Sequence, residues 1–311
     1  MSRTLYIVGP TGVGKTALAV DLAGRFGGEI IGADSRQVYR HMDIGTAKPS
    51  AQERMLVPHH LLDIIEPDQD FGVATFMSLA QKAASDIAGR SGLPIVAGGT
   101  GQYIWALHGG WRVPQPPPDS AFRRAKELEA EVKGAAVLHQ ELYVIDPVRA
   151  SQIHPNNIRR VIRALEIHHM TQNLPSQWAK LSDVEASTAV CKTLVIGLTM
   201  DRQYLYRRID DRVDTMMSSG FLDEVNALEE LGYVMGQGPL SSPGYRELGL
   251  FLAGESTLYE AVERTKFQTH RLARRQYSWF KLTDARIDWL DAANPNLVPE
   301  ASAMIDGFLA G

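Results

Sequence analysis

The sequence has a single cysteine, Cys191, among its 311 residues. A lone cysteine excludes an internal disulfide and a zinc site built from cysteines, and it is typical of a reducing compartment. No apolar run approaches the ~20 residues that a membrane-spanning helix needs. The first apolar run starts at Thr4, so we expect no secretory signal peptide. We therefore expect a cytoplasmic protein that does not associate with a membrane.

The chain also lacks a large net charge of either sign. Its formal net charge is −4, and 22% of its residues are charged. This balance gives no overall attraction to nucleic acid, although it leaves room for a local basic patch. The hydrophobic content of 44% is typical of a globular enzyme, and the length suffices for one large domain or two ordinary ones.

Short apolar runs alternate with helical patterns through the first hundred residues. In chain order, these runs and helical patterns cover residues 4–10, 15–26, 27–35, 59–65, 74–90 and 93–101. Strands that alternate with helices predict an α/β fold, in which helices flank a parallel sheet. Ligands of such folds bind outside the carboxyl ends of the strands, so functional residues should gather where the apolar runs end.

A proline-rich stretch, "WRVPQPPPDS" at residues 111–120, interrupts this pattern. Prolines continue neither a helix nor a sheet, and a run of them forms a stiff connector. Helical patterns then extend from residue 119 to about residue 180, and an apolar run at 192–200 returns to the sheet. We therefore predict a catalytic core of residues 1–113 and 193–311, with a helical insertion at residues 114–192.

The stretch "GPTGVGKT" matches the phosphate-binding pattern G-x-x-x-x-G-K-[ST], and it lies between a predicted strand and a predicted helix. Its glycines allow a tight loop whose backbone N–H groups point inward, and the following helix adds its positive end. A simple glycine turn is the alternative. We predict a phosphate site in which Lys15 neutralises a phosphate and the Thr16 hydroxyl binds Mg²⁺. The loop comprises Gly9, Pro10, Thr11, Gly12, Val13, Gly14, Lys15 and Thr16.

Two further motifs follow predicted strands. "GADSRQVYR" places Asp34 at the carboxyl edge of the sheet, where it can act as a general base, hold magnesium or cap the next helix. "AGGTGQY" offers glycines that permit the close approach of a ligand, together with the Thr100 hydroxyl, although a tight turn would explain it equally well. Beside a phosphate loop, the two motifs together predict one shared cleft.

The run at residues 59–65 carries two histidines and an aspartate. Neighbours in a strand point to opposite faces, so His59 and His60 cannot bind one metal ion together, and we expect hydrogen-bonding roles for them. Asp63 is a candidate for the strand-end acid that holds magnesium in P-loop enzymes, but the run before it is short.

Two stretches concentrate positive charge. "HPNNIRRVIRALE" puts Arg159 and Arg163 on one helical face beside Arg160. Residues 262–281 carry six Lys or Arg against the single Glu263, with aromatic residues among them. This combination can hold phosphates and stack on the bases of single-stranded RNA, whereas a solvated helix face is the alternative for both stretches.

The order of these motifs resembles that of the tRNA dimethylallyltransferases, also called tRNA isopentenyltransferases. The match covers nearly the whole chain and rests on "GPTGVGKT", "DSRQVYR", "MDIGTAKP", "HHLLD", "GGTGQY", "HPNNIRRVIRALE", "PGYRE" and "RRQYSWF". With a lone cysteine we expect no zinc-finger extension, as in the bacterial form of the family. Gln102 replaces a leucine that is common in the family, a change that we do not expect to alter function.

The resemblance implies a P-loop NTPase-like sheet and a helical insertion that closes over tRNA. It implies transfer of a dimethylallyl group from dimethylallyl diphosphate to the exocyclic amine of the adenosine immediately 3′ of the anticodon, in tRNAs that read codons beginning with U. The phosphate loop would hold the diphosphate, with Mg²⁺ as cofactor on Thr16. Asp34 would act as the general base, while Lys15, Thr100 and Arg212 would stabilise the departing diphosphate. We expect a monomer.

The resemblance also implies contacts with the tRNA anticodon stem-loop. The residues concerned are Asp34, Ser35, Arg36, Gln37, Thr100, Arg123, Arg159, Arg160, Val161, Ile162, Arg163, Tyr245, Arg246, Arg274, Arg275, Gln276, Trp279 and Lys281. Three other functions stay open: an isopentenyltransferase that acts on free adenine nucleotides, a small-molecule P-loop kinase, and a tRNA-binding protein with a nucleotide switch. The two basic stretches argue against the free-nucleotide enzyme, because a mononucleotide needs neither.

Overall fold

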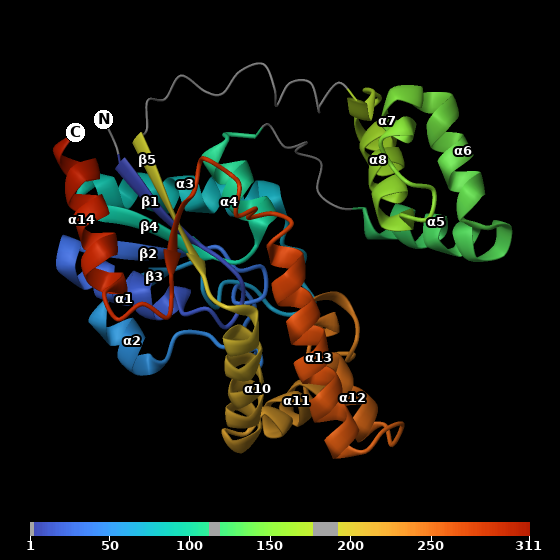
Figure 1. Cartoon of the computed structure of the whole chain (residues 1–311). Coiled ribbons are helices and arrows are strands. Elements are labelled where there is room, and N and C mark those ends of the chain that lie inside the picture. The colour runs from blue at the N-terminus through green and yellow to red at the C-terminus, as the bar shows by residue number, and fades with distance from the viewer. Residues whose placement is uncertain (1–2, 112–118, 177–191) are drawn as a thin grey trace. The chain divides into compact units, whose positions relative to one another are not determined.

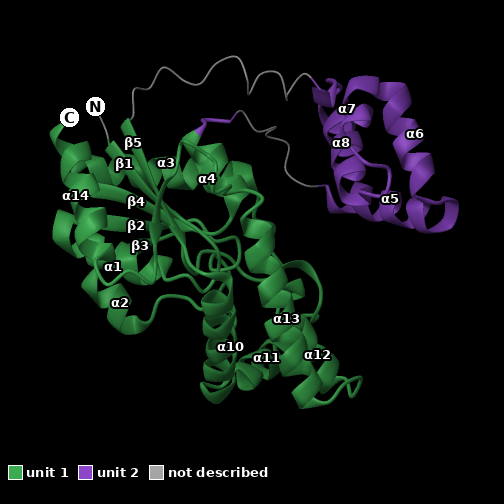
Figure 2. Ribbon diagram, in the orientation of Figure 1, with its two compact units in different colours: residues 1–108, 190–311 green, residues 109–189 purple. Residues whose placement is uncertain are grey.

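The computed structural model describes residues 3–111, 119–176 and 192–311. The chain divides into two compact units, which Figure 2 colours separately. Unit 1 comprises residues 1–108 and 190–311, and unit 2 comprises residues 109–189. Cys191 and most of the proline-rich connector lie outside the described residues.

Unit 1 is built on a six-stranded parallel sheet with the strand order β3-β2-β4-β1-β5-β6 (Figure 1). The strands are β1 (Arg3–Val8), β2 (Gly28–Gly32), β3 (His59–His60), β4 (Leu93–Gly98), β5 (Lys192–Thr199) and β6 (Asp288–Asp291). β1 pairs with β4 on one edge and β5 on the other, and all its residues after Arg3 are buried. The sheet confirms the predicted α/β fold class.

Figure 1 shows α1 and α14 on one face of this sheet, and α3 and α4 on the other. Leu18 and Leu22 of α1 and Ile305 of α14 pack into the core cluster that contains β1 and β5. The helices of unit 1 are α1 (Lys15–Phe26), α2 (Ala51–Leu56), α3 (Val73–Gly89), α4 (Gly101–His108), α10 (Arg202–Ser218), α11 (Phe221–Glu230), η1 (Gly238–Ser241), α12 (Tyr245–Leu252), α13 (Leu258–Gln276) and α14 (Leu297–Ala310). None of the described helices is long and apolar enough to cross a membrane.

The helices α10 to α13 form a group beyond the carboxyl ends of the strands (Figure 1). A second apolar cluster is buried there. Its members include Phe221, Val225, Tyr245 and Leu248, together with Met42 from the segment that follows β2. This packing brings residues far apart in the sequence to the edge of the sheet where ligands bind.

The strand predicted at residues 59–65 is shorter than expected, because only His59 and His60 pair with β2. Leu61 and Asp63 have φ angles of 63° and 54°, a left-handed conformation that a strand cannot contain. The Nε2 atom of His60 lies 2.7 Å from Glu29, and Nδ1 of His59 lies 2.9 Å from the Val57 carbonyl oxygen. The two histidines thus have separate hydrogen-bonding partners.

The described part of unit 2 consists of α5 (Ser120–Lys133), α6 (Ala135–Ile145), α7 (Pro147–Ser151) and α8 (Ile158–Thr171). Leu138 and Leu142 of α6 and Val161 and Leu165 of α8 form its apolar core. The Glu166 side chain is buried in the same unit with no exposed surface.

Candidate active site

The phosphate loop connects β1 to α1, as its pattern predicts. Gly12 and Gly14 have φ angles of 81° and 109°, which other residues rarely adopt. α1 begins at Lys15, so its N-terminal backbone N–H groups lie at the end of the loop. Lys15 Nζ donates a hydrogen bond of 2.8 Å to the carbonyl oxygen of Pro10.

Beside the loop lies a cavity of about 480 Å³ at the carboxyl edge of the sheet, which we call the phosphate-loop cavity. Its charged lining residues are Lys15, Asp34, Lys48, Glu53, Arg208 and Arg212. Thr11, Thr16, Gln37 and Gly98 also line it. Cations, N–H groups and a helix N-terminus at one place form a site for a polyphosphate.

Burial, opposed by Asp34 and assisted by Arg212, lowers the pKa of Lys15 to about 8. Burial also lowers the pKa of Arg212, although the nearby Asp34 acts to raise it. A guanidinium stays charged in proteins, so Arg212 supplies a permanent positive charge, whereas the charge on Lys15 depends on pH. Among the described residues, neither side chain forms an ion pair, which leaves both available to an anionic ligand.

Asp34 and Thr100 lie on neighbouring loops at the ends of β2 and β4. The backbone N–H of Ser35 donates to Thr100 Oγ1 at 3.0 Å, and that of Arg36 donates to Asp34 Oδ1 at 2.9 Å. A side chain at Gly98 would place its Cβ 2.1 Å from the Ala33 carbonyl oxygen, so only glycine allows these loops to approach. Asp34 lines the cavity, and a turn rather than a helix follows it.

A loop at residues 43–49 forms another wall of the phosphate-loop cavity, and Glu224 of α11 fixes its position. The Glu224 carboxylate accepts hydrogen bonds from the backbone N–H groups of Asp43, Ile44 and Gly45 at 2.8, 2.6 and 3.1 Å. It also accepts one from the Tyr245 hydroxyl at 2.6 Å. No motif pointed to Glu224; the glycine within "MDIGTAKP" is the one signal that a close contact occurs here.

The side chains of Gln37 and Lys48 also stabilise the 43–49 loop. Gln37 Nε2 donates to the carbonyl oxygens of residues 46 and 47 at 3.1 and 3.0 Å. The buried Lys48 ammonium contacts both Asp43 and Asp63. Burial acts to raise the pKa of Asp63, but hydrogen bonds from Lys48 and Arg54 together outweigh it, so the pKa is lowered. Asp63 therefore serves this network, and it does not line the phosphate-loop cavity.

The end of α13 is joined to the phosphate loop through Gln276. Its side chain accepts a hydrogen bond from the backbone N–H of Thr11 at 2.7 Å and donates one to the Gly99 carbonyl oxygen at 3.0 Å. Trp279 packs against Gly101, where any side chain would collide with its indole ring. The family resemblance implies a tRNA contact for Gln276, and its side chain is buried against the loop.

The remaining residues assigned to tRNA differ in exposure. Arg246, Arg274, Arg275 and Lys281 are exposed in unit 1, and Arg159 and Arg160 are exposed in unit 2. Tyr245, Val161 and Ile162 are buried in apolar clusters, so their side chains contribute to packing. Arg123 and Arg163 both bind the buried Glu166.

The donor atoms of the phosphate-loop cavity suit a magnesium ion that is bound together with a phosphate. The Thr16 hydroxyl and the Asp34 carboxylate are oxygen ligands, which Mg²⁺ prefers, and Mg²⁺ completes its shell with phosphates and water. Among the residues that the structure describes, no group of three or more His, Cys, Asp or Glu could hold a metal. An ion here would therefore depend on the phosphates of its ligand.

The chain is similar in sequence to known proteins. Two family models match the chain: IPP transferase over residues 37–283, and isopentenyl transferase over residues 2–59. A tRNA dimethylallyltransferase from Thermomicrobium roseum is 46% identical over 290 residues, which are 93% of this chain and 86% of that protein.

Two solved structures are similar over the whole chain. The tRNA isopentenylpyrophosphate transferase from Bacillus halodurans has 39% identity and a TM-score of 0.73, covering 100% of this chain and 97% of its own. A eukaryotic dimethylallyltransferase acting on tRNA has 30% identity and a TM-score of 0.83, covering 100% of this chain and 80% of its own.

Proposed function

The chain belongs to the IPP transferase family, and on this premise we propose how its site works. It is a tRNA dimethylallyltransferase, which transfers a dimethylallyl group from dimethylallyl diphosphate to an adenosine of tRNA. We propose that the acceptor is the exocyclic amine of the adenosine immediately 3′ of the anticodon, in tRNAs that read codons beginning with U. We further propose that the enzyme acts as a cytoplasmic monomer.

One observation carries the proposed mechanism: the phosphate loop, Lys15, Arg208 and Arg212 face a single cavity that Asp34 also lines. The diphosphate lies against the loop and the cations. As the bond between the prenyl carbon and the diphosphate oxygen breaks, negative charge grows on the leaving diphosphate. Fixed donors and cations aimed at that charge stabilise the transition state more than the bound substrate.

Asp34 acts as the general base. The aromatic amine is a weak nucleophile, and the Asp34 carboxylate takes its proton as the new carbon–nitrogen bond forms. The hydrogen bond from the Arg36 N–H orients this carboxylate. Thr100 Oγ1 accepts a hydrogen bond from Ser35, so its own hydroxyl hydrogen can donate to the diphosphate.

Magnesium is the proposed cofactor, and the Thr16 hydroxyl would hold it. A bound ion would supply further positive charge to the leaving diphosphate. The protein's own part is to place the loop, Lys15 and Arg212 around the same phosphates. Removal of magnesium with a chelator should therefore slow the transfer and leave tRNA binding largely unchanged.

We propose that tRNA is held by the exposed cations Arg159, Arg160, Arg246, Arg274 and Arg275, together with Lys281. Arg36 and Ser35, which follow Asp34 in the sequence, would contact the flipped adenosine. A base must leave the stack of the anticodon loop to reach a cavity of this kind. Trp279, part of which is exposed, offers a surface for a neighbouring base.

The direct test incubates the purified protein with Mg²⁺, labelled dimethylallyl diphosphate and unmodified tRNA, and then digests the RNA. Prenylated adenosine should form with tRNA and should be absent when AMP replaces tRNA. Transfer to AMP alone would identify an enzyme of free nucleotides. Transfer to neither acceptor would contradict the proposed function and restore the kinase as an alternative.

A further inference from the structure

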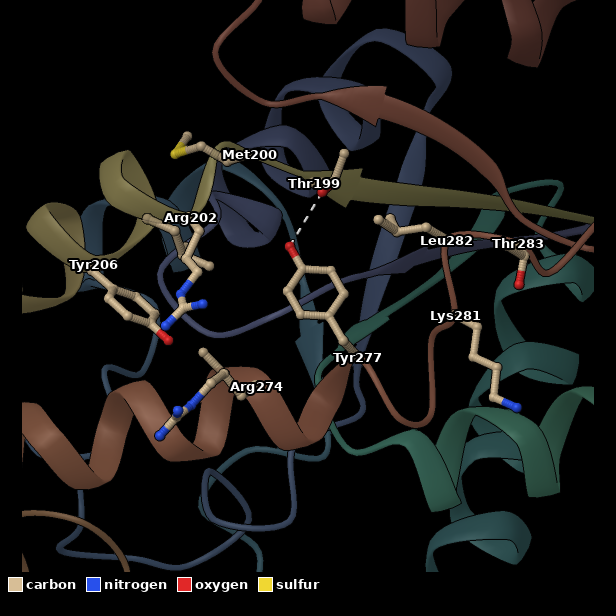
Figure 3. Close-up of a pocket in the computed structure, with 11 residues that line it drawn as sticks. Thr199, Met200, Arg202, Tyr206, Arg274, Tyr277, Lys281, Leu282 and Thr283 are labelled. Carbon is tan, nitrogen blue, oxygen red and sulfur yellow. Dashed lines mark hydrogen bonds between the residues drawn. The ribbon is translucent and has the colours of Figure 1, made fainter.

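A second cavity, also of about 480 Å³, lies at the end of β5 between the start of α10 and the end of α13 (Figure 3). This volume is within the range of ligand-binding pockets. We call it the tyrosine cavity; its lining includes Thr199, Arg202, Tyr206, Arg274, Tyr277 and Lys281. Among the described residues, it shares no lining residue with the phosphate-loop cavity. Leu205, which lines it, would contact a side chain placed at Gly12 of the phosphate loop.

The charges around the tyrosine cavity have one sign. Arg202, Arg274 and Lys281 line it, and no Asp or Glu of the described part of the chain does. Within the described ranges, none of these three cations forms an ion pair. On the same face of α13, by contrast, Lys266 lies 2.8 Å from Asp214 and His270 lies 2.8 Å from Asp210. The pairing of basic residues on α13 with aspartates on α10 thus does not extend to the cavity. Its cations are therefore available to bind an anionic ligand.

The aromatic side chains of the cavity are held in place. The Tyr206 ring stacks on His270 with the ring centres 4.0 Å apart, and the Arg202 guanidinium lies 5.2 Å from the Tyr206 ring centre. The Tyr277 and Thr199 hydroxyl oxygens are 3.2 Å apart, within hydrogen-bond distance. Buried Met200, Leu205 and Ala273 add an apolar surface. Flat, fixed aromatic and guanidinium groups of this kind stack on nucleobases.

The cations do not gather at one point. Figure 3 shows Arg202, Tyr206 and Arg274 on one side of Tyr277, and Lys281 and Leu282 on the other. A small ligand with one anionic group would need its cations together. An RNA strand, however, carries a phosphate on each side of every base, which matches cations on both sides of an aromatic ring.

We propose that the tyrosine cavity binds a second nucleotide of the tRNA strand, distinct from the adenosine that reacts. Its base lies against Tyr277 and the apolar surface, one flanking phosphate meets Arg202 and Arg274, and the other meets Lys281. This inference rests on the proposed function, because that function supplies the RNA. It adds a site of base recognition outside the phosphate-loop cavity.

The test uses anticodon stem-loop RNAs that each lack one base at a position other than the acceptor adenosine. With the unaltered enzyme, removal of one particular base should raise KM about tenfold, the usual effect of a lost base–aromatic stack. Tyr277→Leu should raise KM for the intact RNA by a similar factor. In that variant, removal of the same base should have no further effect, because the contact is already absent.

The phosphate contacts have a separate readout. Arg202→Gln and Lys281→Gln should each weaken RNA binding and reduce the slope of log K against log salt by about 0.7, the value for one single-strand phosphate. Arg207→Gln is the matched control, because Arg207 is an exposed arginine of α10 that lines no described cavity. These surface variants also keep the test valid if Tyr277→Leu does not fold.

Three results would overturn the proposal. In the first, the increases in KM caused by Tyr277→Leu and by base removal would multiply at every position. In the second, the salt slope of Arg202→Gln would equal that of Arg207→Gln. In the third, Arg202→Gln would change KM for dimethylallyl diphosphate alone. The last result would indicate a small-molecule site. If the unaltered enzyme prenylated no intact RNA, the proposed function itself would fail, and the two failures are thus distinguishable.

Discussion

Two arginines of unit 2 and two arginines of the phosphate-loop cavity have opposite surroundings. In unit 2, Arg123 Nε and Nη2 each lie 2.9 Å from an oxygen of the fully buried Glu166 carboxylate, and Arg163 binds the same group. Arg208 and Arg212 of unit 1 line an open cavity and form no ion pair within the described residues. A carboxylate partner makes an arginine part of the fold, whereas its absence leaves the charge for a ligand.

This difference bears on how basic motifs are interpreted. "HPNNIRRVIRALE" ends in Glu166, three residues after Arg163 and on the same helical face. The partner of one of its arginines is therefore contained in the motif itself. We propose tRNA contacts for the exposed Arg159 and Arg160, and a structural role for Arg123 and Arg163.

Loss of the buried carboxylate of unit 2 should have the largest effect. Glu166→Gln leaves Arg123 and Arg163 without their charged partner, and we expect a loss of about 3 kcal/mol in the local stability of unit 2. Hydrogen exchange of the amides in α5 and α8 should accelerate accordingly. The control is Glu131→Gln, an exposed site on α5. Equal protection in both variants would show that the Glu166 cluster does not stabilise the unit.

At the phosphate-loop cavity, Asp34→Asn should reduce turnover by about 10²-fold or more, because the amide cannot take the proton of the amine. The shape of the side chain and its acceptor for the Arg36 N–H are kept, so tRNA affinity should change little. Asp21→Asn, at an exposed position of α1, is the control. A loss of tRNA affinity with normal turnover of the bound complex would refute the assignment of Asp34 as base.

The Glu224 carboxylate positions a wall of the phosphate-loop cavity without lining it, and its substitution tests this role. Glu224→Gln replaces the charged acceptor of three backbone N–H groups, and we expect KM for dimethylallyl diphosphate to rise about tenfold. Thermal unfolding should be compared with that of Glu230→Gln, which alters an exposed residue of α11. If KM stayed constant while stability fell, Glu224 would stabilise the fold without positioning the 43–49 loop.

The pH dependence of substrate capture should be the smallest effect. Burial lowers the pKa of Lys15 to about 8, so its ammonium is charged below that pH and neutral above it. The charged form attracts the diphosphate, so kcat/KM for dimethylallyl diphosphate should be level below pH 8 and decline above it. The decline of kcat should begin at higher pH, because bound diphosphate favours the ammonium. Coincident profiles for both constants would contradict a role for Lys15 in binding.

The sequence predicted the elements that depend on local patterns. The phosphate loop, the central strands and the shared edge of Asp34 and Thr100 follow from glycine spacing and apolar runs, and family similarity confirms the resemblance that the motifs suggested. The strand at residues 59–65 was wrong beyond His60, because the left-handed Leu61 and Asp63 leave no mark in the apolar pattern.

The contacts that hold the site were not predictable in the same way. Gln276 binds the Thr11 N–H across 265 positions of sequence, and Glu224 binds the 43–45 backbone across about 180. Neither side chain belongs to a local pattern that identifies its partner, because tertiary packing alone brings the segments together. The cluster of cations in the tyrosine cavity is likewise visible only when α10 and α13 are placed side by side.

The most direct test of the central claim is titration of inorganic diphosphate into three proteins: the unaltered enzyme, Arg212→Gln and Arg163→Gln. Loss of one charge-assisted contact should weaken diphosphate binding by Arg212→Gln about tenfold or more. Arg163→Gln should bind diphosphate as the unaltered enzyme does and should instead speed hydrogen exchange in unit 2. Normal binding by Arg212→Gln, or weakened binding by Arg163→Gln, would contradict the division between cations that bind substrate and cations that hold the fold.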